Sequence, residues 1–145
     1  MSIMEINMKK CFAFWAVVVT ILGLAACGGN QKEVTIDYGK SDIYTKSDMD
    51  AAIKLIKNEF STWEGCELHC IRYTSDECCS ENNIAWMNDL SEGGTEFTQC
   101  IEFVSDFHSP KANAGAWNPD SEYTDWQWWL ARTDNGNWNL MTCGY

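Results

Sequence analysis

The sequence predicts an α+β fold in which an N-terminal helix packs on an antiparallel sheet. Three patterns point to this class. Apolar residues recur at helical spacing between residues 45 and 63. Residues 96–109 alternate between apolar and polar side chains, as a half-buried strand does. Two further runs, at residues 121–132 and 137–145, flank Asp134-Asn135-Gly136, a turn-forming sequence, and so indicate a hairpin.

The first helix is expected over residues 45–63, and its apolar stripe should face a core. Thr45 or Ser47 can cap it, because each is followed three residues later by an aspartate that suits the exposed N–H groups. Gly65 ends the run, and residues 66–74 are expected to form a strand. The stripe contains Met49, Ala52, Ile53, Ile56, Phe60 and Trp63.

A second helix is expected from a capping box at residues 74–77 to about Leu90. In the long strand that follows, Phe97, Ile101, Phe103 and Phe107 share one face, while the polar residues share the other. The expected order is therefore helix-strand-helix-strand-strand-strand.

Residues 1–26 have the layout of a signal peptide. Lys9 and Lys10 precede an apolar run at 11–26, which is shorter than the roughly 20 residues needed to cross a bilayer. The run ends in Leu-Ala-Ala-Cys at 24–27, which resembles the bacterial lipobox, after which signal peptidase II cuts. We expect Cys27 to carry lipid such as palmitate and to hold the protein on the extracytoplasmic face of a bacterial cell membrane. An uncleaved anchor or an unmodified signal is the alternative.

Residues 27–42 are polar and contain glycine, which favours a lipidated N-terminus and flexible tether, with the folded domain at 43–145. The alternation of Val34, Ile36 and Tyr38 leaves a short edge strand as an alternative. Removal of residues 1–26 would change the net charge from −11 to about −12. Nucleic acid is excluded as a partner by this charge, because it binds basic surfaces.

Six cysteines follow Cys27, and their pairing stays open. If residues 66–74 are a strand, Cys66 and Cys70 lie about 13 Å apart, beyond the roughly 7 Å that a disulfide spans. Disulfides among other pairs or buried thiols are both compatible with the sequence. A metal site is not expected, because His69 would point away from both neighbouring sulfurs. The six are Cys66, Cys70, Cys78, Cys79, Cys100 and Cys143.

The expected order of elements, closing on Trp-x-x-x-Arg, Gly-x-Trp-x-Leu and Gly-Tyr, resembles the nuclear-transport-factor-2-like or cystatin-like fold. More narrowly, the chain is similar to small secreted bacterial lipoproteins of uncharacterised function that carry such a domain and share Asn118-Pro119 before residues 124–132. The resemblance covers residues 41–145 and rests mainly on the last thirty. It implies a curved, cone-like sheet that wraps a helix and leaves a pocket at its open end, used by some members for catalysis and by others for binding.

Tryptophans are concentrated near the C-terminus. Trp126 and Trp128 should share one strand face, and Trp129 should point to the other. Most of these rings are expected in the core, where buried aromatic area stabilises a small domain. Trp117 and Trp129 are the candidates for stacking on a ligand, with Glu102 beside them.

Asp106 and His108 share the polar face of the long strand and are weak candidates for a general base, with Tyr123 as a partner. The family's dehydratases and isomerases place an aspartate and a histidine together inside the cone. A solvated strand face explains the same residues. A cone-type lyase or isomerase is therefore an alternative function.

The sequence favours a lipid-anchored, non-enzymatic protein without a cofactor. Its cone-shaped pocket or sheet face would bind a small ligand or an envelope protein, and a homodimer is a further option. A purely structural or assembly module is another alternative, and it would have a filled cone.

Overall fold

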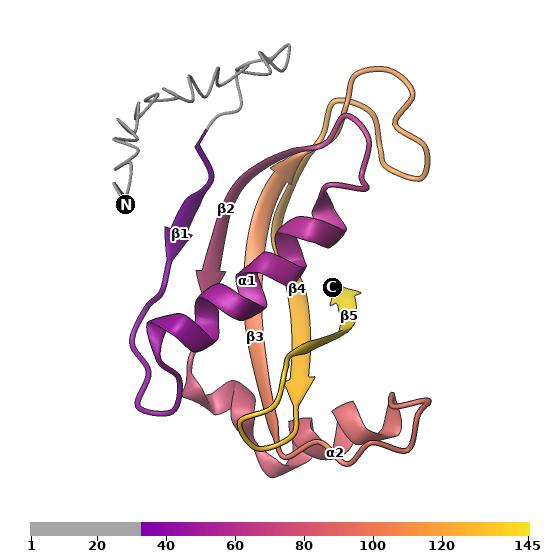
Figure 1. Cartoon of the computed structure of the whole chain (residues 1–145). Helices are drawn as coiled ribbons and strands as arrows, with labels where there is room; N and C mark the ends of the chain where they lie inside the picture. Colours follow the sequence, from indigo (N-terminus) through magenta and orange to yellow (C-terminus); the bar gives the residue numbers. More distant parts are fainter. Residues whose placement is uncertain (1–32) are drawn as a thin grey trace, which may run out of the picture. The chain divides into compact units, whose positions relative to one another are not determined.

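The computed structural model describes residues 33–145, so the expected signal peptide, Cys27 and the start of the tether lie outside the described residues. The fold is α+β, with two α-helices and a five-stranded sheet (Figure 1). In chain order the elements are β1 (Thr35–Asp37), α1 (Lys46–Phe60), β2 (Glu67–Tyr73), a short 3-10 helix η1 (Asp76–Cys79), α2 (Glu81–Asp89), β3 (Gln99–His108), β4 (Glu122–Arg132) and β5 (Asn139–Gly144).

The sheet is open and mixed, with the strand order β1-β2-β3-β4-β5. β1 runs parallel to β2, and the other neighbours are antiparallel, so the expectation of a wholly antiparallel sheet was incomplete. The parallel pair arises because α1 returns the chain to the starting end before β2 begins. β1 also lies inside the segment expected as a tether. Its pairing with Cys70–Arg72 corresponds to the edge strand that the sequence left as an alternative.

α1 begins at a capping box formed by Thr45, as expected. The Thr45 hydroxyl accepts a hydrogen bond from the Asp48 amide at 3.1 Å, and the Asp48 carboxylate accepts one from the Thr45 amide at 2.9 Å. The helix lies across one face of the sheet (Figure 1). Its buried stripe contains five of the six predicted residues, and the sixth, Trp63, lies beyond the end of the helix at Phe60; the five are Met49, Ala52, Ile53, Ile56 and Phe60.

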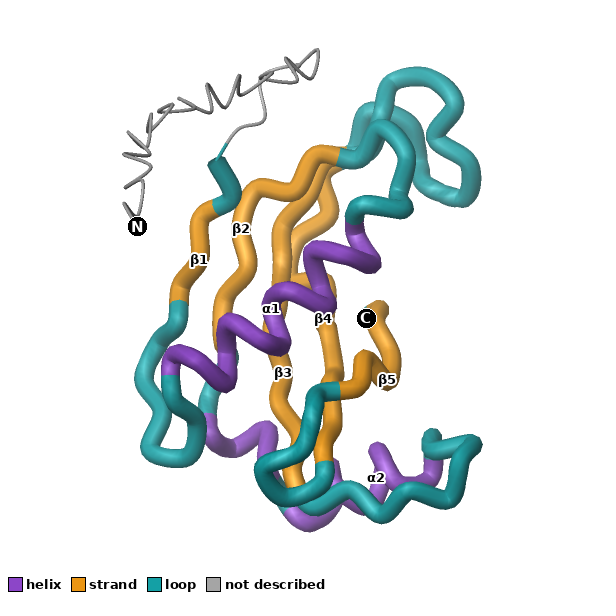
Figure 2. Tube along the Cα trace, viewed as in Figure 1, coloured by secondary structure: helices purple, strands orange, loops and turns teal. Residues whose placement is uncertain are grey.

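The second helix differs from the expected one. The chain forms η1 first, and α2 starts only after Ser80, whose hydroxyl accepts a hydrogen bond from the Asn83 amide at 3.2 Å (Figure 2). Ser75, which precedes η1, makes no capping bond. The Asp76 carboxylate accepts hydrogen bonds from Ser41 and Tyr73 instead, so contacts distant in sequence replace the local capping box.

The sheet has an inner face, packed against α1, and an outer face. On the inner face Phe103, Phe107 and Trp128 are fully buried. On the outer face the side chains of Arg72 and Asp106 are partly exposed, at 31% and 27%. α2 lies at the lower end of the sheet in Figure 1.

One buried and one partly buried set of polar contacts fix the strands and the helix. The indole N–H of Trp128 donates to the Ser105 hydroxyl at 2.8 Å, and neither residue is exposed. Arg132, at the end of β4, binds Asp48 of α1 at 2.8 Å and Gln99 of β3 at 2.7 Å. Buried polar groups require such partners, so both contacts specify the register in which the elements meet.

Within residues 33–145, neither helix combines the length and the apolar content needed to cross a membrane.

Candidate functional site

Asp106 lies on the outer sheet face, where Arg72 holds it. Its carboxylate accepts bonds from both Arg72 amino groups at 2.8 and 3.0 Å, and from the Asp125 amide at 3.0 Å. Arg72 also binds the Asp125 carboxylate at 2.7 Å. The guanidinium lowers the pKa of Asp106 to about 2. A carboxylate so strongly stabilised in its ionised form is a poor general base at neutral pH.

His108, at the end of β3, lies between two carboxylates. Its Nδ1 is 2.7 Å from Glu122, and its Nε2 is 2.8 Å from Asp120. Hydrogen bonds to Asp120 and then to Glu122 raise the pKa of His108, because they favour the charged imidazolium. Glu122 also lies 3.6 Å from His69 Nε2. The two ring nitrogens of His108 thus connect β3 to the first residue of β4 and to the loop that precedes it.

Tyr123 lies on the inner face, away from Asp106 and His108. Its ring stacks on Phe107 at 4.8 Å, and its hydroxyl accepts a hydrogen bond from the Asn118 amide at 2.9 Å. The structure therefore does not bring Asp106, His108 and Tyr123 together in one pocket. The lyase or isomerase alternative needs such convergence and has no geometric support.

Aromatic rings fill the space between the C-terminal end of α1 and the sheet. Trp63 stacks on Trp128 with ring centres 5.1 Å apart and contacts Trp117 at 5.0 Å. Trp117 in turn contacts Trp126 at 5.3 Å. This end of the interior is consequently packed with side chains. Trp117, a predicted ligand contact, is part of this packing.

Trp129 and Glu102, the other predicted ligand contacts, are neighbours on the outer face, where they pair across β3 and β4. Trp129 is only 8% exposed because Trp86 of α2 packs edge-on against it at 5.3 Å. Burial raises the pKa of Glu102. Trp86 itself is 40% exposed, so it offers more aromatic surface to a partner than Trp129 does.

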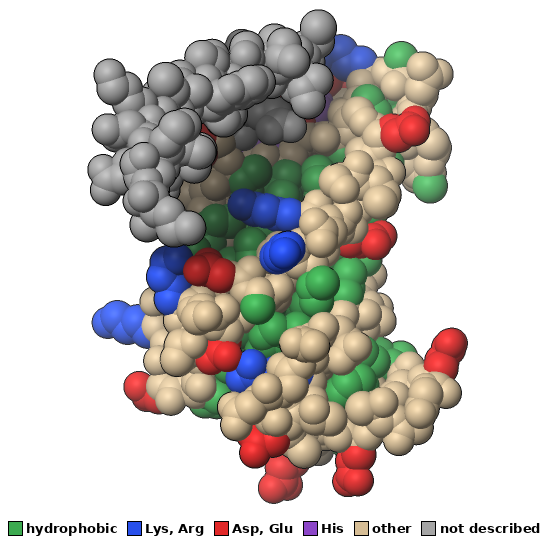
Figure 3. Space-filling view, viewed as in Figure 1, with side chains coloured by type: hydrophobic (Ala, Val, Ile, Leu, Met, Phe, Trp, Pro, Cys, Tyr) green, Lys and Arg blue, Asp and Glu red, His purple; other side chains and the backbone are tan. Residues whose placement is uncertain are grey.

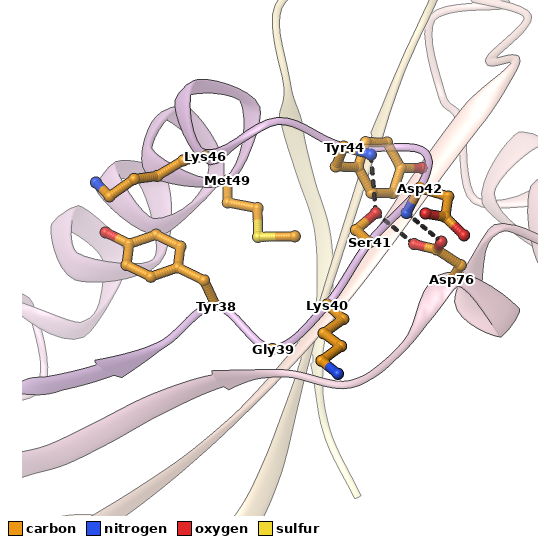
Figure 4. Close-up of a pocket in the computed structure, with 9 residues that line it drawn as sticks. All are labelled: Tyr38, Gly39, Lys40, Ser41, Asp42, Tyr44, Lys46, Met49 and Asp76. Carbon is orange, nitrogen blue, oxygen red and sulfur yellow. Dashed lines mark hydrogen bonds between the residues drawn. The ribbon is translucent and has the colours of Figure 1, made fainter.

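A cavity of about 560 Å³ lies between the loop that follows β1 and the start of α1 (Figure 4). We call it the corner cavity. Tyr38, Lys46 and Met49 lie on one side of it in the view, and Ser41, Tyr44 and Asp76 lie on the other. Ligand pockets in proteins commonly have volumes of about 300–1,000 Å³. The lining residues are Tyr38, Gly39, Lys40, Ser41, Asp42, Tyr44, Lys46, Met49 and Asp76.

Internal hydrogen bonds hold the walls of the corner cavity in place. Tyr38 donates to Asp50 at 2.5 Å, and Lys46 binds the same carboxylate at 2.9 Å while lying over the Tyr38 ring. Among residues 33–145, the side chains of Lys40 and Asp42 have no hydrogen-bond or ion-pair partner. The cavity thus combines a fixed, partly apolar lining with one unpaired cation and one unpaired anion.

A smaller groove of about 80 Å³ lies beside β5. Trp86 and Trp129 contribute aromatic surface to its lining, and β5 contributes its C-terminal half. Tyr145 is 75% exposed. We call this feature the β5 groove; it is lined by Trp86, Gln127, Trp129, Thr142, Cys143, Gly144 and Tyr145.

The six cysteines after Cys27 are all free thiols. Burial raises the pKa of Cys78 to about 11 and that of Cys100 to about 12. Cys70 lies 2.7 Å from Arg72 and 3.4 Å from Asp106 on the outer face. In the described part of the chain, no three His, Cys, Asp or Glu side chains are arranged to hold a metal ion.

Comparison of the chain with protein-family models, with curated proteins and with solved structures finds no match. The function therefore has to be argued from the residues themselves.

Sequence reasoning missed the corner cavity because its lining falls largely in the segment expected as a tether. One signal was present. Gly39 has a left-handed backbone (φ 55°), and it follows the alternating Val34, Ile36 and Tyr38, as a turn after a strand would. A turn there directs residues 40–45 back toward the helix.

Proposed function

We propose that this chain is a lipid-anchored protein of the extracytoplasmic face of a bacterial membrane, and that its folded part is a non-enzymatic binding domain. The observation that carries the binding role is the corner cavity, whose volume suits a small molecule and whose walls are preorganised. The dispersal of Asp106, His108 and Tyr123 supports binding over catalysis. Cleavage before Cys27 and attachment of lipid there remain part of the proposal, as the lipobox-like sequence predicts.

The ligand that fits the corner cavity is a small polar molecule carrying both charges. The partly exposed Tyr38 ring supplies apolar contact area. Lys40 and Asp42, two residues apart at the rim, can pair with a carboxylate and an ammonium group of the ligand. Because the other charged groups of the lining already have partners, binding would not require breaking an internal ion pair.

The resemblance to the nuclear-transport-factor-2-like or cystatin-like fold also remains a proposal. A helix lying across one face of a sheet supports it (Figure 1). The aromatic packing near Trp63 argues for a cone whose interior is filled at that end. We therefore propose that the ligand binds in the corner cavity and not inside the cone.

The anchoring proposal predicts that Cys27→Ser abolishes the attachment of lipid to the protein. Bacteria that express the chain would be fed a labelled fatty acid, and the purified protein would be analysed for incorporated label. We expect label in the parent chain and none in the variant. Cys66→Ser serves as the matched control and should keep the label. Equal labelling of the Cys27→Ser chain would overturn lipidation at this residue.

The ligand proposal predicts a retained small molecule in native mass spectrometry of gently purified protein. Lys40→Ala should reduce the occupied fraction about tenfold, because it removes the unpaired cation at the rim. Lys54→Ala, which removes an exposed lysine elsewhere on α1, should leave occupancy unchanged. A clean unliganded mass, together with no thermal stabilisation by a panel of amino acids and betaines, would reject this site.

A further inference from the structure

β5 is an edge strand without charged residues or proline, and a register shift at Met141 interrupts its pairing with β4. It has one neighbour, β4, and among residues 33–145 the backbone groups of Leu140–Gly144 make no backbone hydrogen bond outside that pairing. Natural edge strands are commonly protected by charged residues, proline, very short length or a bulge, and of these β5 has only the bulge. β5 spans 6 residues and contains no charge and no proline, whereas β1 at the opposite edge spans 3.

The β5 groove lies beside this edge and supplies side-chain contacts. Trp86 and Tyr145 are 40% and 75% exposed, so both rings retain surface for a partner. A register shift in the pairing of β4 and β5 leaves Met141 without an opposite residue. Regular pairing with an added strand is therefore expected at Thr142–Gly144, the same residues that line the groove.

Charge selects the partner. Between Arg72 and Lys111 the chain has no lysine or arginine, and this stretch includes all of α2. On the face seen in Figure 3, acidic side chains mark the lower edge of the described part, where α2 lies in Figure 1. A second copy of this chain, with a net charge of −11, would be repelled, whereas a basic segment would be attracted. The acidic residues of η1, α2 and the segment up to β3 are Asp76, Glu77, Glu81, Asp89, Glu92 and Glu96.

We propose that β5 binds an extended basic segment of another protein, which adds a strand to the sheet and places an apolar side chain in the β5 groove. Backbone hydrogen bonds supply part of the affinity in such complexes, and the side chain seated in a pocket supplies specificity. This site is separate from the corner cavity, which lies against α1 and the loop after β1. Whether β5 binds such a segment therefore does not depend on whether the corner cavity binds a small ligand.

The test uses the full-length chain in mild detergent and a synthetic peptide of about ten residues that alternates lysine with valine, a length typical of long strands. Binding would be measured by calorimetry and located by backbone hydrogen–deuterium exchange. We expect slower exchange in Thr142–Tyr145 when the peptide is bound. The affinity should fall with increasing salt, because part of it is electrostatic.

Two control peptides separate strand addition from charge attraction. A peptide with glutamate in place of lysine should not bind. A peptide that keeps every lysine but carries proline at alternate valines cannot donate the strand's hydrogen bonds, so it should not protect Thr142–Tyr145. Equal protection by the proline peptide would overturn the proposal.

Two exposed side chains of the groove give the matching protein variants. Trp86→Ala and Tyr145→Ala should each weaken the lysine–valine peptide about tenfold, as loss of an aromatic anchor does. Ile43→Ala removes an apolar side chain that is 42% exposed outside the groove, and it should have no effect. Trp86→Ala could also disturb the packing on Trp129, whereas Tyr145 is 75% exposed, so Tyr145→Ala tests the groove without that complication. Binding unaffected by Tyr145→Ala, or self-association that protects β5 without peptide, would refute a basic partner at this edge.

Discussion

Arg132 illustrates how a single residue joins elements that are distant in sequence. Its side chain is 8% exposed, and it binds Asp48 of α1 and Gln99 of β3 while lying over the Trp138 ring at 4.3 Å. Trp138 donates to the Asp48 carbonyl at 2.9 Å. The Thr45 amide and then Arg132 lower the pKa of Asp48, so this carboxylate is ionised when it meets the guanidinium.

Replacement of Arg132 by alanine should therefore destabilise the protein strongly. We expect a loss of about 2 kcal/mol in the free energy of unfolding, because the substitution removes charge-assisted hydrogen bonds to Asp48 and the packing of the guanidinium on Trp138. Urea denaturation followed by tryptophan fluorescence measures this loss. Lys57→Ala, at an exposed position on α1, should change the same quantity by less than about 0.5 kcal/mol. An equal effect of both substitutions would contradict the role assigned to Arg132.

Single-residue predictions succeeded where they depended only on strand alternation. The opposite orientations of Trp128 and Trp129 follow from that period, and the structure places the two rings on different faces. Asp106 was correctly placed on the polar face of its strand. Its partner could not be predicted, because Arg72 lies 34 positions away on a strand whose register is set by the whole sheet.

At the scale of elements, hydrogen bonds between its two ends close the loop at residues 109–121. Ser109 accepts a hydrogen bond from the Ser121 amide at 2.9 Å, and the Asp120 amide donates to the Pro110 carbonyl at 3.0 Å. His108 adds contacts to Asp120 and Glu122 that depend on its protonation, because both of its ring nitrogens face carboxylates. The loop carries Trp117 into the aromatic packing.

The contacts that His108 makes with Asp120 and Glu122, and with them the protection of the loop at residues 109–121, should weaken as the pH rises. The folded-state pKa of His108 is raised above its ordinary value of about 6.5, so its stabilising contribution is complete below that value. The contribution is lost as pH rises through the raised pKa. Hydrogen–deuterium exchange of residues 110–121, corrected for intrinsic rates, should show less protection at high pH. His108→Gln should abolish this pH dependence; its persistence in the variant would exclude the histidine as the cause.

The elements with strong local patterns could be predicted, and those that depend on distant contacts could not. α1 and the β4–β5 hairpin have clear periodicity and turn signals, and both are present. β1 is only 3 residues long and is stabilised by pairing with β2, after the whole of α1 has intervened. η1 arises where Ser41 and Tyr73 bind Asp76, and local sequence does not reveal those partners.

For the whole molecule, the reactivity of two buried cysteines can be used to measure how often the core opens. Cys78 and Cys100 are 4% and 0% exposed, and each thiol lies near the other's carbonyl, at 3.8 and 3.1 Å. Their raised pKa values, about 11 and about 12, keep them as unreactive thiols near neutral pH. Reaction with a labelling reagent thus requires the core to open.

Under reducing conditions, Cys78 and Cys100 should be labelled at the same slow rate, set by global unfolding. Peptide mapping after timed labelling measures the rate of each cysteine. Arg132→Ala should accelerate both together, while partly exposed Cys70 reacts early in every variant. Rapid labelling of Cys100 alone would mean that β3 opens without the rest of the core.

The corner cavity and the β5 groove show why a candidate site was harder to predict than the fold class. The corner cavity requires the loop after β1 to meet α1, and the groove requires α2 to reach β5. Apolar periodicity indicates which face of an element is buried, but it does not indicate where two elements leave a gap.

The contact between Ser105 and Trp128 has a consequence for how this sequence can change over generations. If Ser105 alone were replaced by an apolar residue, the indole N–H of Trp128 would be buried without a hydrogen-bond partner. If Trp128 alone were replaced, the Ser105 hydroxyl would be buried without one. Either loss alone is costly, whereas replacing both by apolar side chains of matching shape is nearly neutral. Related chains should therefore show coupled substitution, with the pair inherited or exchanged as a unit across β3 and β4.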